Sequence, residues 1–80
     1  MKTSRSRYRI QVKGRLDPSW SDRLGGMAIQ TLDADGEHIS VLLGPLADQS
    51  ALTGVINALV DMHHEVLSVD RLGNDASETG

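Results

Sequence analysis

The stretch RYRIQVKGRL, residues 7–16, decides the fold, because polar and apolar residues alternate along its whole length. One set of alternate positions carries Arg7, Arg9, Gln11, Lys13 and Arg15, and the other carries Tyr8, Ile10, Val12, Gly14 and Leu16. A period of two residues is typical of a β-strand with one buried face and one solvated face. We therefore predict a strand whose basic side chains lie in solvent and whose other face lies on the core.

Two further strands, a helix and a fourth strand are predicted downstream. The apolar runs 27–32 and 38–43 flank residues 33–37, where Asp35-Gly36 suits the positive φ of a hairpin turn. Gly44-Pro45 is expected to end the third strand, and Asp48 is a suitable N-cap for the helix that follows. The helix is predicted from one apolar stripe, formed by Leu52, Val55, Ile56, Leu59, Val60 and His63. The run 66–69 then predicts the last strand.

The order β-β-β-α-β predicts an α+β fold, a two-layer sandwich in which a four-stranded, mostly antiparallel sheet carries one long helix on one face. If the first three strands form a meander and the fourth adds beside the first, the strand order is 3-2-1-4. A chain of 80 residues supports one hydrophobic core. We therefore expect a single domain over residues 1–73 and a disordered polar tail over residues 74–80.

A short helical insert is predicted between the first two strands. Asp17 is a good N-cap, Pro18 suits the first helical position, and Gly25-Gly26 ends the turn, which places one or two helical turns at residues 18–24. Trp20 and Leu24 are four residues apart and are expected to pack together over an edge of the sheet. The alternative is that Trp20 is exposed and contacts a ligand.

Composition excludes several classes of function. The chain has no cysteine, so it has no disulfide, no thiolate metal site and no cysteine nucleophile. Its core must be built mainly from aliphatic side chains, and a cofactor cavity is not expected. No apolar stretch follows the basic N-terminal residues, so neither a signal peptide nor a membrane span is expected, and the predicted location is the cytoplasm.

The segments YRIQVKGRLDPSWSDRLGGMAI, GPLADQSALTGVINAL and LSVDRL resemble a family of short, uncharacterised bacterial proteins. The resemblance extends over most of residues 8–72 and rests on the pattern YRIxVxGxLDxxWSD, GPLADQxAL and LSV. It implies a shared fold and no accepted activity, cofactor or substrate. Members of that family tend to carry a glycine where this chain ends its helix with Met62-His63-His64. A positive φ at that point would therefore strain His63.

Catalytic and metal-binding patterns are weak. His63, His64 and Glu65 could be joined by His38 around a metal ion, but adjacent side chains at a helix end point about 100° apart and do not converge. No GxSxG turn is present, and Gly25-Gly26 precedes a strand, whereas a phosphate loop leads into a helix. We therefore expect no enzymatic activity, no cofactor and no metal ion.

Charge is distributed unevenly along the chain. Residues 1–23 contain seven basic and two acidic residues, whereas residues 24–80 contain one basic and nine acidic residues. Arg7, Arg9, Lys13 and Arg15 share the solvated face of the first strand, where positions two residues apart are separated by about 7 Å, which matches phosphate spacing along nucleic acid. They form a candidate anion-binding site, although no aromatic residues are interleaved with them. The alternative is a solvated face neutralised by neighbouring acids such as Asp70.

Self-association is suggested by the helix. Ala51, Gly54 and Ala58 lie along one flank, where small side chains would let another backbone approach, and a glycine inside a helix costs about 0.5 to 1 kcal/mol relative to alanine. The alternative is that this flank contacts the insert that carries Trp20. The sequence thus favours a small non-enzymatic binding or protein-interaction module that forms a homodimer. The alternative function is a nucleic-acid or anion-binding domain that uses the basic face of the first strand.

Overall fold

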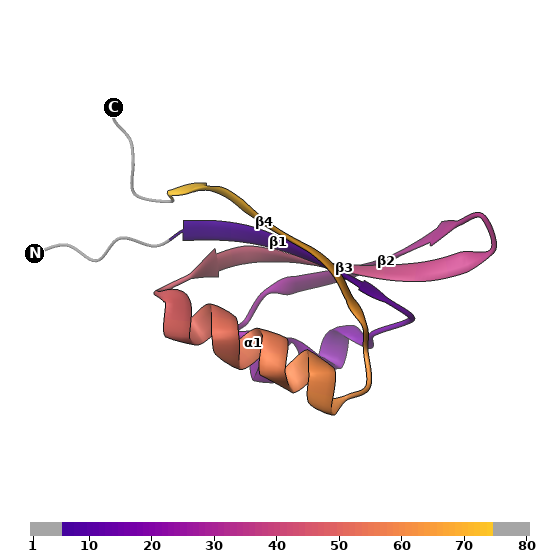
Figure 1. Ribbon diagram of the computed structural model, residues 1–80, viewed down its shortest axis with the longest axis horizontal. Helices are drawn as coiled ribbons and strands as arrows, with labels where there is room; N and C mark the ends of the chain where they lie inside the picture. The colour runs from indigo at the N-terminus through magenta and orange to yellow at the C-terminus, as the bar shows by residue number, and fades with distance from the viewer. Residues whose placement is uncertain (1–5, 75–80) are drawn as a thin grey trace, which may run out of the picture.

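One sheet and two helices form the fold in the computed structural model, which describes residues 6–74 (Figure 1). In chain order the elements are β1 (Ser6–Lys13), the 3-10 helix η1 (Pro18–Leu24), β2 (Ala28–Ala34), β3 (Glu37–Leu46), α1 (Gln49–Asp61) and β4 (Val66–Asn74). All three neighbouring strand pairs are antiparallel. Both helices lie on the same side of the sheet, and the β2-β3 hairpin extends beyond them (Figure 1). The predicted α+β fold with one helix-covered sheet is confirmed.

The strand order is β2-β3-β1-β4, and the predicted order 3-2-1-4 is wrong. The first strand pairs with β3 and not with β2, because the chain after β1 does not turn back as a hairpin. Ser40 of β3 holds the segment that follows β1 against β3. Its Oγ accepts a hydrogen bond from Leu16 N at 2.8 Å and donates one to Gly14 O at 2.8 Å. The segment then crosses to the helix side through η1, and this leaves β2 at the outer edge. The placement of β4 beside β1 is as predicted.

The third and fourth strands extend well beyond their predicted ends. β3 continues through Gly44 and Pro45, which lie opposite Tyr8 and Arg7 of β1. The pairing of β2 with β3 begins at Leu43, so beyond that residue β3 has a neighbour on one side only, where a proline without an N–H donor is tolerated. β4 extends to Asn74, so the predicted boundary at residue 73 falls inside this strand. The rest of the predicted tail lies outside the described residues.

The hydrophobic core lies between the sheet and the two helices. It consists of Tyr8, Ile10, Val12, Leu16, Leu24, Met27, Ile29, Leu42, Leu46, Val55 and Leu59. The helix α1 is rotated slightly from its predicted orientation: Val60 is 57% exposed, whereas Ala58 and Met62 pack against the core. The reason is that η1 packs beside α1 and closes the core along that flank.

The predicted packing of Trp20 is wrong, although that of Leu24 is right. Leu24 is fully buried, whereas Trp20 is 38% exposed and the guanidinium of Arg23 lies 5.4 Å from its ring centre. The segment is a 3-10 helix with three residues per turn, so residues three apart share a face. Trp20 and Arg23 therefore face solvent together, while Ser21 and Leu24 face inward and Ser21 Oγ donates to Met27 O.

The helix α1 ends as the sequence suggests, with His63 at φ 66°. The N–H of His64 donates to Leu59 O at 3.0 Å, and the N–H of His63 donates to Val60 O at 2.9 Å. These two bonds form a Schellman motif, in which the residue after the C-cap takes the left-handed conformation that glycine adopts most easily. His63 therefore occupies a position that is strained for a side chain with a Cβ atom.

Candidate functional site

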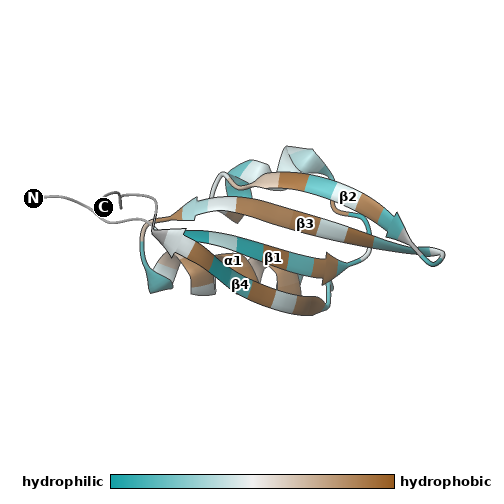
Figure 2. Ribbon diagram, turned by 90° about the horizontal axis from the view of Figure 1, so that it is seen from above, coloured by the Kyte–Doolittle hydropathy of each residue, from teal (hydrophilic) through white to brown (hydrophobic). Residues whose placement is uncertain are grey.

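The candidate site is the face of the sheet opposite α1 and η1, which we call the open face. Among residues 6–74, both helices cover the other face, and Figure 2 shows the four strands lying in front of them. Alternation along β1 and β3 determines which side chains point there, because directly opposed residues in an antiparallel pair lie on the same face. Two rows of side chains occupy its centre, one basic and one aliphatic.

The basic row consists of Arg7, Arg9 and Lys13, which are exposed on the open face of β1. The structure thus places three of the four predicted anion-binding residues on one strand. The fourth, Arg15, lies beyond the end of β1, after Gly14, whose φ of 103° interrupts the extended backbone. Arg15 instead lines a surface pocket of about 380 Å³ together with Leu16, Asp17, Pro18 and Thr31.

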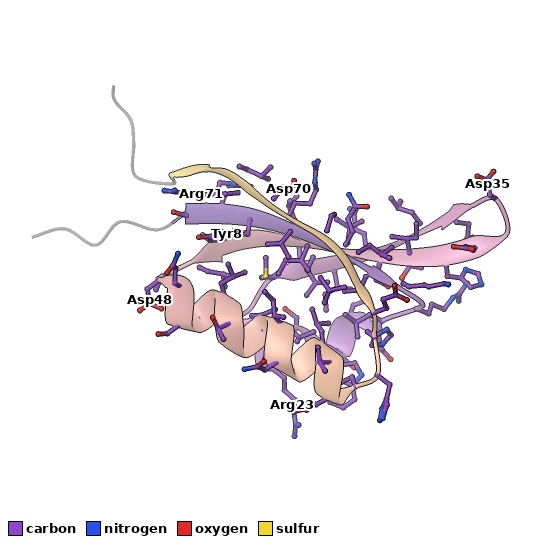
Figure 3. The ribbon with its side chains drawn as sticks, viewed as in Figure 1. Tyr8, Arg23, Asp35, Asp48, Asp70 and Arg71 are labelled. Carbon is purple, nitrogen blue, oxygen red and sulfur yellow. The ribbon has the colours of Figure 1, made fainter. Side chains whose placement is uncertain are left out.

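The middle of the basic row is joined to β4. Arg9 lies directly opposite Asp70 in the register, and its Nη2 is 3.3 Å from Asp70 Oδ2. Asp70 lies on the side of the sheet away from α1 (Figure 3). Its carboxylate offsets one positive charge of the row, as expected if the fourth strand pairs with the first.

The aliphatic row consists of Leu32 on β2 and Ile39, Val41 and Leu43 on β3. Val41 and Leu43 alternate with the buried Ser40 and Leu42 and therefore point to the open face. Leu32 is opposite Ile39 in the register, so it shares that face. Leu43 is 37% exposed and Leu32 is 52% exposed. Sequence reasoning missed this row, although the run ISVLL at residues 39–43 has the apolar character of a strand that is buried on both faces.

The open face has no aromatic side chain. The chain contains one Tyr, one Trp and no Phe. Tyr8 is buried in the core, on the helix side of β1, and Trp20 belongs to η1. A sheet that binds single-stranded nucleic acid normally stacks bases on aromatic side chains, so this surface lacks that means of recognition.

The predicted dimer flank of α1 is partly covered. Ala51 and Ala58 are half-buried and pack against the core. Ala58 also lines a surface pocket of about 360 Å³ with Arg23, Asp61 and Met62, so η1 approaches this flank. Gly54 is exposed, and a Cβ atom added there would meet no atom within 4 Å. The structure therefore leaves space for a partner at Gly54, and the interface stays a prediction.

The histidines named by the sequence do not come together. His38 Nδ1 pairs with Asp33 Oδ1 across the β2-β3 hairpin. His64 Nδ1 lies 3.1 Å from the carbonyl oxygen of Lys13, at the junction of α1 and β4. Within the described part of the chain, no three His, Asp or Glu side chains are grouped so that they could hold a metal ion.

A family model described as a domain of unknown function (DUF8691) matches residues 7–70. The chain belongs to the DUF8691 family. The match begins at Arg7 and ends at Asp70, so the segment shared with other DUF8691 domains contains both rows of the open face and the Arg9–Asp70 pair. The sequence resemblance to an uncharacterised family is confirmed to this extent.

The DUF8691 family is described as a domain of unknown function, so membership in it assigns neither a reaction nor a binding partner to this chain. No curated protein and no solved structure shows significant similarity to this chain. Neither helix within residues 6–74 has the length and hydropathy needed to cross a membrane. The function of this DUF8691 domain must therefore be argued from its own surface.

Proposed function

We propose that this DUF8691 domain is a small non-enzymatic protein-interaction module that binds its partner through the open face of its sheet. The proposal rests mainly on the position of the aliphatic row on this exposed face. An antiparallel sheet with one solvated face normally alternates apolar residues inward and polar residues outward. Here Ile39, Val41, Leu43 and Leu32 lie together on the outward face. Clustered exposed apolar side chains of this kind typically mark an interaction surface.

Covering the aliphatic row provides the free energy for binding. Burial of apolar surface contributes about 25 cal/mol per Å² removed from water. The exposed parts of Leu32 and Leu43 supply such surface, and the half-buried Ile39 and Val41 between them make it continuous. The neighbouring basic row supplies charge at the rim, where it steers association and selects partners more than it adds affinity.

The proposal includes binding without catalysis. Neither row contains a hydroxyl, thiol or imidazole group, which are the usual nucleophiles and bases of active sites.

We further propose that the domain acts in the cytoplasm of a bacterium, which is supported by the resemblance of its sequence to short bacterial proteins. A homodimer formed through Ala51, Gly54 and Ala58 is the remaining part of the proposal, and the open space at Gly54 supports it.

The test of the open face is a selection of displayed random peptides on the immobilised full chain. Peptides that bind are then measured against Leu43→Lys, which places a charge in the aliphatic row. We expect affinity to fall by at least about tenfold, which corresponds to 1.4 kcal/mol. Asn57→Lys is the matched control, because Asn57 is exposed on α1 in the other layer of the fold. It should leave binding unchanged, and circular dichroism should show both variants folded.

Two outcomes would contradict the proposed function. In the first, the selected peptides bind Leu43→Lys as tightly as the unmodified chain. In the second, the selection yields no peptide whose binding depends on Leu43. Either result would show that the aliphatic row is a tolerated exposed surface of the isolated domain.

A second candidate function is the binding of an anionic polymer such as nucleic acid. The observation that favours it is the placement of Arg7, Arg9 and Lys13 on one face of one strand. The Arg9–Asp70 pair and the lack of an aromatic side chain on the open face weigh against it. We therefore rank it below a protein partner.

A further inference from the structure

The two rows of the open face are direct neighbours, because β1 pairs with β3. The register places Arg9 opposite Leu43 and Lys13 opposite Ile39. Adjacent strands are about 4.8 Å apart, so each of these cations lies beside an aliphatic side chain. A segment that covers the aliphatic row along its length must therefore also have one of its edges over the basic row.

The backbone of the occupant must satisfy its own hydrogen bonds. Along the aliphatic row, β3 has β2 on one side and β1 on the other, and β1 lies between β3 and β4, so the main-chain groups beneath the two rows are already paired within the sheet. A peptide on the open face cannot add to the sheet as another strand, since strand addition occurs at an edge. An α-helix pairs all but its terminal main-chain groups internally and can therefore bury one side on such a face.

The dimensions of the surface also fit one helix. An α-helix with its side chains is about 10 to 12 Å wide, which is about two strand spacings. Lying along β3, it would cover the aliphatic row and reach the edge of β1. The basic row extends from Arg7 to Lys13, a distance of about 20 Å along the strand, and about 13 helical residues cover this length. The same sheet already packs against one helix in this way, because α1 lies on its opposite face (Figure 1).

The charges determine what the flank of that helix must carry. The chain has a net charge of −3, yet the described side chains on the open face of β1 include three cations and no acid. Asp70 offsets the middle of the row from β4. Carboxylates on the flank of the partner would complement the row and would disfavour a basic partner. A second copy of this chain would instead bring its own basic row to the interface.

From this geometry we infer that the partner segment is an amphipathic helix with an aliphatic face over Leu32, Ile39, Val41 and Leu43 and acidic residues along the flank over Arg7, Arg9 and Lys13. This inference rests on the proposed function and specifies the chemistry of the partner. Nucleic acid is disfavoured as the occupant, because phosphates and sugars do not cover an aliphatic row and no aromatic side chain is available for stacking.

The test is a displayed library of amphipathic peptides of about 18 residues, long enough to span the basic row as a helix. Apolar positions are fixed at helical spacing, and each flanking position is varied among Glu, Gln and Lys. Selection on the full chain should enrich Glu along one flank. Selection on the double variant Arg7→Glu, Lys13→Glu should enrich Lys at the same positions. The matched control, Thr53→Glu with Asn57→Glu, places the same new acids on exposed positions of α1 and should leave the Glu preference unchanged.

A second measurement tests the helical conformation. A proline placed in the middle of a selected peptide should lower its affinity at least about tenfold, because an interior proline breaks a helix. The inference is overturned if flanking charges show no preference, if the preference does not reverse on the double variant, or if the proline peptides bind equally well. It is also overturned if a DNA oligonucleotide binds the open face more tightly than the peptides and displaces them.

These outcomes are distinguishable from failure of the proposed function. Peptides that lose binding on Leu43→Lys but show no acidic or helical preference would leave the open face as a binding site and would reject only the acidic helix. Peptides that are indifferent to Leu43→Lys would reject the open face itself.

Discussion

Arg9 and Asp70, which are 61 positions apart in the sequence, form an ion pair across β1 and β4 with 3.3 Å between Nη2 and Oδ2. The two side chains are 44% and 46% exposed. Water and salt screen such pairs, so most contribute between about 0 and 1 kcal/mol to stability. The pair therefore matters more for the charge presented by the open face than for the stability of the fold.

The first prediction concerns this pair. Asp70→Ala should lower the free energy of unfolding by less than about 1 kcal/mol, because the pair is exposed to solvent. A double-mutant cycle with Arg9→Ala, measured by urea denaturation, should give a coupling energy of about 0.2 to 1 kcal/mol. A coupling energy well above this range would show that the pair is buried more deeply than its exposed fractions indicate.

The second prediction concerns the end of η1. Gly25 has φ 72°, and a Cβ atom there would lie 2.8 Å from Leu46 Cδ2 and 3.2 Å from Val55 Cγ2. Gly25→Ala should therefore destabilise the fold by about 2 to 4 kcal/mol, because both backbone strain and overpacking oppose it. Thermal and urea denaturation would measure the loss.

Gly26 provides the matched control for Gly25. Its φ is 73°, nearly the same, but a Cβ atom there would meet nothing within 4 Å. Gly26→Ala should cost only the backbone strain, about 1 to 2 kcal/mol. Equal losses for the two variants would contradict close packing of Gly25 against β3 and α1.

The third prediction concerns the end of α1. His63 is exposed and has φ 66°, so His63→Gly removes backbone strain without loss of buried apolar surface. We expect the free energy of unfolding to rise by about 0.5 to 1 kcal/mol, after allowance for the greater freedom of glycine in the unfolded chain. His64→Gly should have the opposite sign, because the half-buried His64 ring would be lost and its Nδ1 lies 3.1 Å from Lys13 O. If both variants lose stability, the left-handed backbone of His63 does not strain the folded protein, and the prediction is wrong.

Sequence reasoning succeeded where local chemistry decides the structure. The alternation in β1 identified its buried and exposed faces, and Asp48 caps α1 by accepting a hydrogen bond from Ala51 N at 2.9 Å. Asp17 caps η1 in the same way through Ser19 N at 3.0 Å. The positive φ of His63 was also anticipated, because helix termination is a local event.

Sequence reasoning failed where the type of helix, or the strand with which a segment pairs, had to be known. Trp20 and Leu24 share a face in an α-helix but not in the 3-10 helix that forms. The pairing of β1 with β3 depends on contacts such as Ser40 Oγ with Leu16 N, 24 positions apart. The aliphatic row was missed because its exposure depends on which face of the sheet the helices cover, and that is set by the whole topology.

The fourth prediction concerns self-association through α1. If Ala51, Gly54 and Ala58 form a dimer interface, Gly54→Leu should convert the dimer to a monomer in sedimentation experiments. The monomer should remain folded, because the new side chain enters open space and leucine has a higher helix propensity than glycine. An unmodified chain that is monomeric at high concentration would reject the homodimer. A dimer that persists in the variant would indicate another surface, such as β4, where Leu67, Val69 and Leu72 are exposed.

The fifth prediction distinguishes the second candidate function from the first. If nucleic acid binds the basic row, the logarithm of the binding constant should fall with the logarithm of salt concentration with a slope of about −2 to −3, as three phosphate contacts require. Lys13→Ala should make the slope shallower by about one, whereas Arg15→Ala should leave it unchanged, because Arg15 lies beyond β1. Asp70→Asn should strengthen binding, since it removes the carboxylate that Arg9 contacts. Fluorescence anisotropy with single- and double-stranded oligonucleotides measures all three variants. No binding at low salt, where electrostatic attraction is strongest, would leave the basic row as the rim of a protein-binding surface.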